Sequence, residues 1–249
     1  MMKQIIGLLL FGIFSLSTLA QERIVEVKPF NKVIVSPIID VELIKGDHES
    51  VRIVAEGVDF DKINVRNSGK TLKIFLDHAR MGKKHEKVYR EDEPDVLFYR
   101  SRYEGAKVKA YVTFKSLERV QVRGDGKLIC NDRLGSEKLK LKLYGEIDAE
   151  IASIDTKKLK VAAFGDNEIK IRGGAANRQV YKMFGDNQIY TTKVNSTNAR
   201  VSVFGEGAVR LSADQKIKLS SFGDSRIFYS GDPVISKSIV LGDLRLRRN

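Results

Sequence analysis

Several residue types that commonly stabilise or equip a protein are scarce in this 249-residue chain, which has one cysteine, no tryptophan, three histidines and four prolines. The single Cys130 cannot form an internal disulfide, so the fold must be held together by packing alone. The histidines have no cysteine and no second ligand pair at metal-binding spacing, and the Gly-x-Ser-x-Gly elbow of serine hydrolases is absent. These absences argue against a disulfide-stapled domain, a zinc site and a serine hydrolase.

Long apolar runs are also scarce, and the one that is present lies within residues 1–20. Lys3, an apolar stretch of h-region length and small residues before Gln21 form the pattern of a secretory signal peptide. The run is too short for a membrane span, and no second run approaches that length. We therefore expect residues 1–20 to be removed and the mature chain to be exported, to the periplasm or the outer cell surface, without a transmembrane segment.

Acidic residues are outnumbered, with 44 Lys and Arg against 32 Asp and Glu and a net charge of +12. Such an excess favours acidic partners, which for an exported protein are anionic glycans or other envelope components. Nucleic acid is not expected as a partner, because no RNA- or DNA-binding signature appears.

What the sequence does contain is a repeat. Phe-Gly-Asp-Asn stands at residues 164–167 and again at 184–187, and related segments bring the number of copies to seven, with 18 to 21 residues between successive glycines. A period near twenty that persists over seven copies is typical of a solenoid. The glycines of the seven copies are Gly124, Gly145, Gly165, Gly185, Gly205, Gly223 and Gly242.

Both arms of each copy alternate between apolar and polar residues, as half-buried strands do. Around Gly165 the residues expected to point inward are Leu159, Val161, Ala163, Asn167, Ile169 and Ile171. The glycine and the acid after it form a bend between the arms. Because the Leu-x-x-Leu-x-Leu pattern of leucine-rich repeats is missing, these features predict an all-β fold, a right-handed parallel β-helix with coils of about 20 residues.

The predicted organisation has two parts after the signal peptide, both within a single domain over 21–249. Residues 21–116 form irregular strands that cap the stack, residues 77–105 within them form a charged excursion without periodicity, and residues 117–249 form the regular coils. Long excursions of this kind are often functional or disordered.

Four features of the chain carry a family resemblance: the exported start, the opening "FNKVIVSPIIDVELIKGD", the glycine-centred repeats and the ending "YSGDPVISKSIVLGDLRLRR". In these features the chain resembles the putative auto-transporter adhesin head GIN domain family. The likeness covers roughly residues 28–247. It implies a β-helix similar in shape to the pectin-lyase-like proteins without their catalytic residues, and a role in adhesion. The family has no established catalytic residues, so the resemblance assigns none to this chain. Its members tend to have small polar residues at the position after the glycine, where this chain has an acid.

Equal positions in stacked coils form columns, and two columns are charged. The residue after each glycine is acidic, and the residue five positions before it is basic in every copy except at Val180. The candidate binding residues are Lys140, Lys160, Arg200 and Lys218 in the basic column and Asp166, Asp186, Glu206 and Asp224 in the acidic column. The basic column continues to Arg119 and Lys237, and the acidic column to Asp125, Glu146 and Asp243.

Each column has more than one interpretation. The acids either cap their own turns or form a Ca²⁺ site with Asn167 and Asn187, although the Gly-Gly-x-Gly-x-Asp pattern of calcium-binding β-rolls is absent. The bases either form a solvated face or bind an anionic polymer. Just before the glycines, an aromatic series runs from Tyr144 to Phe222, and it is either a structural stack or a platform for sugars.

The predicted function is that of a non-enzymatic adhesion or binding module without a cofactor. The alternative is a polysaccharide-acting, lyase-like β-helix enzyme, which would need an acidic calcium cluster and a base facing one groove. Candidate pairs exist, since Lys170 lies four residues beyond Asp166 and Arg210 lies four beyond Glu206. Cys130 falls in an inward column and is expected to be a buried small hydrophobe.

Overall fold

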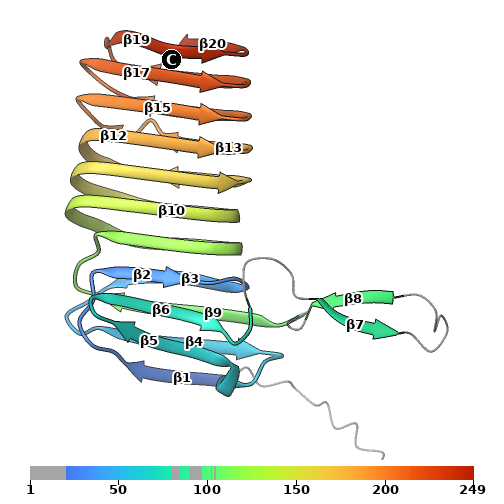
Figure 1. The fold of residues 1–249 in the computed structure, drawn as a ribbon. Helices are drawn as coiled ribbons and strands as arrows, with labels where there is room; N and C mark the ends of the chain where they lie inside the picture. Colours follow the sequence, from blue (N-terminus) through green and yellow to red (C-terminus); the bar gives the residue numbers. More distant parts are fainter. Residues whose placement is uncertain (1–20, 80–84, 90–96, 102, 104) are drawn as a thin grey trace, which may run out of the picture.

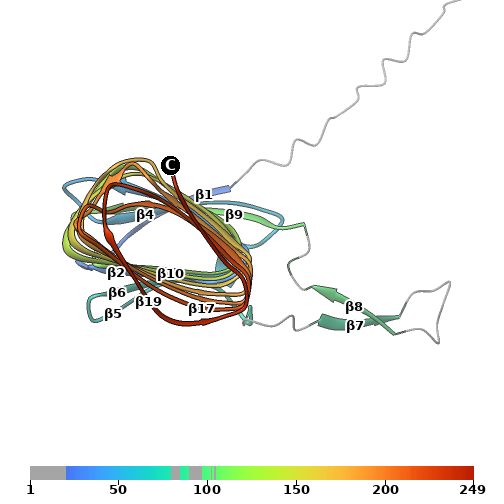
Figure 2. The same cartoon turned by 90° about the horizontal axis from the view of Figure 1, so that it is seen from above.

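The computed structural model describes residues 21–79, 85–89, 97–101, 103 and 105–249. The predicted signal peptide, residues 1–20, lies outside these residues, as do parts of the charged excursion. The described chain consists mainly of strands stacked into a column, and its coils superimpose when they are viewed along the column axis (Figures 1 and 2). Within the described residues no helix is long and apolar enough to cross a membrane.

The regular part of the column consists of parallel strands that pair one repeat apart, so Leu159 lies beside Gln179, which lies beside Ala199. One wall contains β10, β12, β15, β17 and β19, and a second contains β10, β11, β13, β16, β18 and β20. The predicted parallel β-solenoid is confirmed. The strands are β10 (Arg119–Gly165), β11 (Asn167–Ile171), β12 (Gly174–Phe184), β13 (Asn187–Thr191), β14 (Val194–Asn195), β15 (Asn198–Phe204), β16 (Gly207–Ser212), β17 (Lys216–Phe222), β18 (Ser225–Ser230), β19 (Val234–Leu241) and β20 (Leu244–Arg248).

The N-terminal strands continue both walls and then cap the stack. On one wall β2 pairs in parallel with β10 and β6, and β5 then pairs with β6 in the antiparallel direction. On the other, β3 pairs in parallel with β10 and β9, and the antiparallel strands β4 and β1 follow. These elements are β1 (Gln21–Glu26), β2 (Lys32–Val35), β3 (Ile39–Lys45), β4 (Ser50–Glu56), the single-turn 3-10 helix η1 (Phe60–Lys62), β5 (Ile63–Ser68), β6 (Thr71–Leu76) and β9 (Lys107–Phe114).

The described parts of the excursion contain a feature that the sequence pattern did not predict. β7 (His85–Tyr89) and β8 (Leu97–Ser101) pair as an antiparallel hairpin, which lies beside the column rather than within it (Figures 1 and 2). Neither strand pairs with any other described strand.

The core runs along the inside of the column, as the period-two pattern predicted. Ile169, Val203 and Cys130 are at most 1% exposed, and the other inward residues around Gly165 are buried as well. Burial of Cys130 raises the pKa of its thiol from 9.0 to about 11. Not all of the core is apolar, because the fully buried Tyr181 hydroxyl contacts Gln179 Oε1 and lies 2.7 Å from Thr191 Oγ1.

The bends depend on glycine because successive coils touch there through their backbones. Gly185 has φ +95°, and a Cβ atom added to it would lie 2.6 Å from the carbonyl oxygen of Gly165. The same approach to the preceding repeat glycine recurs at Gly145, Gly165, Gly205, Gly223 and Gly242, whereas a Cβ at Gly124 would meet Pro37 of the cap. Only a residue without a Cβ fits both the left-handed conformation and the contact.

Candidate functional site

One wall of the solenoid carries basic side chains and no acids. Its strand segments are 32–35, 71–76, 119–123, 138–144, 158–164, 178–184, 198–204 and 216–222, and none of them contains Asp or Glu. Because strand residues alternate in and out, every second residue of these segments faces solvent. We call thirteen of these outward cations the basic face, and leave out Arg123, whose guanidinium lies over the Tyr144 ring: Lys32, Lys73, Arg119, Lys138, Lys140, Lys142, Lys158, Lys160, Arg178, Lys182, Arg200, Lys216 and Lys218.

The predicted basic column lies on this face, with one correction. Lys160 pairs with Val180, Val180 with Arg200, and Arg200 with Lys218, as the repeat alignment predicted. Lys237 is not the next member. β19 holds one extra residue at a bulge opposite β17, so Ser236 stands beside Lys218 and Lys237 stands beside Leu219.

Strand pairing extends the basic column below the repeats, where the sequence alignment had no glycine to follow. Lys32 of β2 lies beside Arg119, and its neighbour on the other side is Thr71 of β6. Lys73 projects from β6 two residues further along, beside Ile34. The only signal in the sequence was the alternation of "NKVIV" and "KTLKIFL", which does not by itself place these strands next to the first coil.

The positive charge of the basic face is uncompensated. Among the described residues no acid lies within 4.0 Å of any of its cations, whereas eleven other basic residues form ion pairs elsewhere. Burial and the neighbouring cations, led by Arg119 and Lys160, lower the pKa of Lys140. The pKa of Lys158 is lowered chiefly by the charge of Lys160. Both shifts show that the cations repel one another.

The aromatic series at the edge of this wall is a stack. Tyr144, Phe164, Phe184, Phe204 and Phe222 follow one another with ring centroids 4.7 to 4.9 Å apart and planes within 6° of parallel. The faces of the inner rings are therefore covered by their neighbours, and a sugar ring would need such a face to stack on. The stack supports the coil spacing and does not form a sugar platform.

The acidic column is exposed and does not gather the ligands expected for Ca²⁺. The side chains of Asn167 and Asn187 point into the interior of the solenoid instead, where they are at most 3% exposed. Asn167 Nδ2 donates to Asn187 Oδ1 at 2.8 Å, and each Asn also donates to the carbonyl oxygen of the Phe three residues before it. The alternative interpretation of the acids, a Ca²⁺ site completed by these amides, therefore lacks two of its ligands. Among the described residues no three His, Cys, Asp or Glu side chains form a group that could hold a metal ion.

The acids also do not cap their own turns through the side-chain hydrogen bonds that the prediction required, among the residues that the structure describes. The two asparagines close the bends at 164–167 and 184–187 from inside. Of the column's described carboxylates, only that of Asp224 accepts a backbone hydrogen bond, from the N–H of Asp243 in the next coil at 3.2 Å. The acids remain solvated on the outside of the bends, where water screens their mutual repulsion.

The acid and base pairs considered for a lyase do not form. Lys170 donates to Glu168 at 2.8 Å rather than to Asp166, and this hydrogen bond holds the pKa of Lys170 above its ordinary value. A catalytic base needs a lowered pKa. Arg210, which was considered with Glu206, lies over two aromatic rings at 4.6 and 5.2 Å from their centroids.

A hollow of about 300 Å³ between the cap and the first coil does contain acids and bases. It is lined by Ile38, Asp40, Val54, Glu56, Ala106, Lys107, Val108, Lys109 and Asp125. Several of its charged groups have partners within the fold, since Asp40 Oδ1 accepts the N–H of Lys127 at 2.8 Å and Lys107 pairs with Glu56 at 3.8 Å. The hydrogen bond that Lys109 donates to Glu42 raises the pKa of Lys109, which again is the wrong direction for a base.

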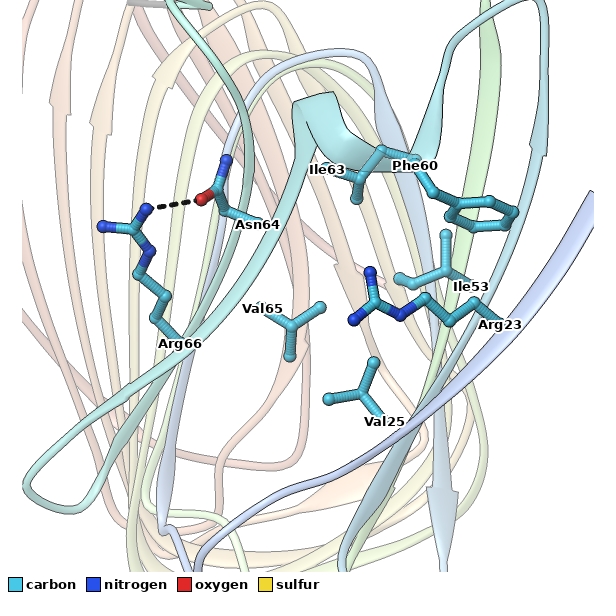
Figure 3. A pocket seen from close by; sticks show the side chains of 8 residues that line it. All are labelled: Arg23, Val25, Ile53, Phe60, Ile63, Asn64, Val65 and Arg66. Carbon is cyan, nitrogen blue, oxygen red and sulfur yellow. Dashed lines mark hydrogen bonds between the residues drawn. The ribbon is translucent and has the colours of Figure 1, made fainter.

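A second hollow, of about 180 Å³, opens at the N-terminal end between β1 and β5 (Figure 3). Its walls are mostly apolar, and its polar residues are Arg23, Asn64 and Arg66. Arg66 donates to Asn64 Oδ1 at 2.7 Å. The lining contains no acid, histidine, cysteine or hydroxyl group, so the hollow holds no nucleophile or general acid.

The family described as "Putative auto-transporter adhesin, head GIN domain" matches residues 29–233. The chain belongs to this family. The match begins after β1 and spans the rest of the cap, the excursion and all but the last coil, in agreement with the resemblance noted from the repeats. No curated protein sequence matches the chain.

Solved structures show the same fold. A putative adhesin from Bacteroides fragilis superimposes with a TM-score of 0.73 at 21% identity, covering 94% of this chain and 98% of the other. A putative adhesin from Parabacteroides merdae has a TM-score of 0.64 at 17% identity, with 92% and 95% covered. A structure from Parabacteroides distasonis described as a putative lipid binding protein has a TM-score of 0.61 at 16% identity, with 92% and 96% covered. At these identities the likeness concerns the fold alone.

Proposed function

We propose that this GIN-domain protein is an exported, non-enzymatic binding module that adheres to anionic glycans of the cell envelope through its basic face. The family and the β-solenoid fold support an adhesion-like role. The observation that carries the ligand class is the segregation of charge. Thirteen cations share one acid-free wall, while the ion-paired bases lie on the rest of the surface.

This segregation of charge destabilises the sheet electrostatically, and a wall with only a structural role would not need it. Like charges side by side in adjacent strands destabilise a sheet, and the lowered pKa values of Lys140 and Lys158 record that repulsion. Alternating acids and bases would solubilise the wall equally well without the penalty. A polyanion on the face removes the repulsion, so the arrangement favours the bound state.

The contacts of the candidate bases, among the residues that the structure describes, support the non-enzymatic part of the proposal. The two bases of the lyase alternative, Lys170 and Arg210, form other contacts, and Lys109 in the larger hollow has a raised rather than a lowered pKa. Export to the periplasm or the outer surface rests on the signal-like residues 1–20 and on the adhesin family.

The test is a glycan array read at low and physiological salt. Anionic glycans should bind at low salt, neutral glycans should not, and the signal should weaken as salt screens the contacts. A Lys140→Glu, Lys160→Glu variant should lose binding without any fall in its melting temperature, since the change relieves repulsion between cations. A matched variant, Lys127→Glu with Arg226→Glu on the opposite wall, carries the same net charge and should bind nearly as well as the unmodified protein. Equal loss in both variants would refute the basic face as the site.

Incubating the protein with acidic glycans and Ca²⁺ tests the enzymatic alternative. We expect no unsaturated products, because Lys109 in the larger hollow and Lys170 on the surface both have a raised pKa, the wrong direction for a catalytic base. Accumulation of such products would refute the proposal.

A further inference from the structure

The shape of the basic face indicates how a ligand would lie on it. The face spans eight neighbouring strands, from β6 through β2, three coils of β10, and then β12, β15 and β17. Adjacent strands lie ~4.8 Å apart, so the face is ~34 Å long parallel to the column axis. Along any one strand it holds at most three cations, at alternate residues such as Lys138, Lys140 and Lys142, a width of ~14 Å.

The cations are continuous in the long direction only. Every one of the eight strands contributes at least one, and where Val180 interrupts the basic column, Arg178 and Lys182 stand two residues to either side of it in the same strand. In the short direction the positive charge ends at the aromatic stack on one side. A chain laid across the strands meets three cations at most, whereas a chain laid along the axis meets all eight rows.

The residue types indicate what kind of anion is accepted. Ten of the thirteen cations are lysines, which act as point charges on flexible stems rather than as bidentate forks. Recognition by lysine depends on charge and spacing more than on the geometry of one head group. Carboxylate, sulfate and phosphate groups would therefore all be accepted, provided that they follow one another along a linear chain.

We infer that the ligand is a linear polyanion that lies parallel to the solenoid axis and occupies ~34 Å of the basic face. This inference rests on the proposed function, and it adds the orientation, the length and the charge-based selectivity of the bound chain. A flat anionic membrane is the competing partner. It would gain from a wide face, whereas this one is narrow, and the outward residues between the cations include no tryptophan to anchor at a lipid interface.

The experiment measures the affinity of labelled polyuronate oligomers of defined length by fluorescence anisotropy at low salt. Affinity should rise with length up to an extended span of ~34 Å and then level off. Polysulfate and polyphosphate oligomers of equal length and charge should follow the same curve. Vesicles containing anionic lipid form the comparison arm.

A shortened face provides the decisive variant. Arg200→Gln, Lys216→Gln and Lys218→Gln remove the cations of the two upper rows and leave six rows, ~24 Å, intact. The affinity of ~34 Å oligomers should fall on the order of tenfold, since three exposed charge contacts are lost, while oligomers of ~20 Å should bind as before. The matched control neutralises Lys193, Arg226 and Arg247, which lie outside the face, and should leave both lengths unaffected.

The outcomes separate this inference from the function on which it rests. Binding that does not change with length beyond ~14 Å, or an equal loss for short and long oligomers in the shortened-face variant, would overturn the axial orientation and leave the basic face as the binding site. Binding to anionic vesicles with none to soluble oligomers would overturn the linear ligand. Binding to neither would overturn the proposed function as well.

Discussion

The close approach of successive coils at the glycine bends allows a stability prediction with a worked magnitude. Gly185→Ala places a methyl group 2.6 Å from the carbonyl oxygen of Gly165, a backbone atom that cannot rotate away. The substitution also forces alanine to φ +95°, which costs ~1–3 kcal/mol. The steric overlap adds ~1–3 kcal/mol. We therefore expect Gly185→Ala to lower the free energy of unfolding by ~2–6 kcal/mol, a large part of the ~5–15 kcal/mol typical of a domain.

Two other glycines provide controls that separate the two causes. Gly69 has φ +55° with no atom within 4 Å of an added Cβ, so Gly69→Ala should cost only the conformational strain of ~1–2 kcal/mol. Gly135 also has open space around it and no positive φ, so Gly135→Ala should be within about 0.5 kcal/mol of the unmodified protein.

Urea denaturation followed by circular dichroism measures all three variants, with the midpoint compared at unchanged m-value. The expected order of destabilisation is Gly185→Ala, then Gly69→Ala, then Gly135→Ala. If Gly185→Ala and Gly69→Ala are equally destabilised, the coils do not touch through their backbones at the bend. If all three are alike, the bend does not require a left-handed residue.

Four further predictions follow from burial and charge. Ile169→Asp should unfold the protein at 25 °C by circular dichroism because it buries an unpaired charge, while Lys160→Gln should shift the melting temperature by no more than about 2 °C. The Cys130 thiol should resist thiol reagents at pH 8 in the native protein and react fully in urea. Because burial raises the pKa of this thiol to about 11, the stabilisation that it contributes is complete below the unfolded pKa near 8.5 and is lost as the pH rises toward 11. Comparing the pH dependence of unfolding with that of Cys130→Ala would detect this loss. Millimolar Ca²⁺ should barely change the melting temperature, and Asp166→Asn should be mild; a calcium-dependent rise that disappears in this variant would contradict the solvated interpretation of the acids. Lys140→Gln should raise the melting temperature at pH 7 in low salt, and added salt should reduce this rise. Because the pKa of Lys140 is lowered in the folded state, the charged lysine destabilises the fold fully below that pKa, and the destabilisation should vanish as the pH rises through the unfolded pKa near 10.4.

Much of the fold could be predicted from the sequence because a solenoid is built from local information repeated at a fixed interval. The alternation around Gly165 set which residues face inward, and Ile169 and Val203 are buried as predicted. The aromatic stack followed from the same alignment, since equal positions one repeat apart become neighbours in adjacent coils. None of these inferences needed contacts between segments of unrelated sequence.

The corrections arose where the repeat gave no guide. The extra residue in β19 moves Lys237 out of the basic column, and only strand pairing reveals it, because the spacing of the glycines changes by a single residue. The alternation places Asn187 inward, like Asn167, but only the side-chain hydrogen bond shows that the two amides bind each other instead of a cation. Another side-chain hydrogen bond decided that Lys170 pairs with Glu168, two residues away on the same face of the strand.

By itself, the sequence determined the parallel solenoid, its inward columns and the part of the basic column that lies within the repeats, because each of these depends on one period. Only the tertiary structure decided the extent of the basic face and its lack of acids. The cap strands β2 and β6 lie more than forty residues before the first basic residue of the regular coils, and they share no repeat with it, yet they place Lys32 and Lys73 on the same wall. Which charges become neighbours in a sheet is set by strand order, and strand order between unlike segments is a property of the folded chain.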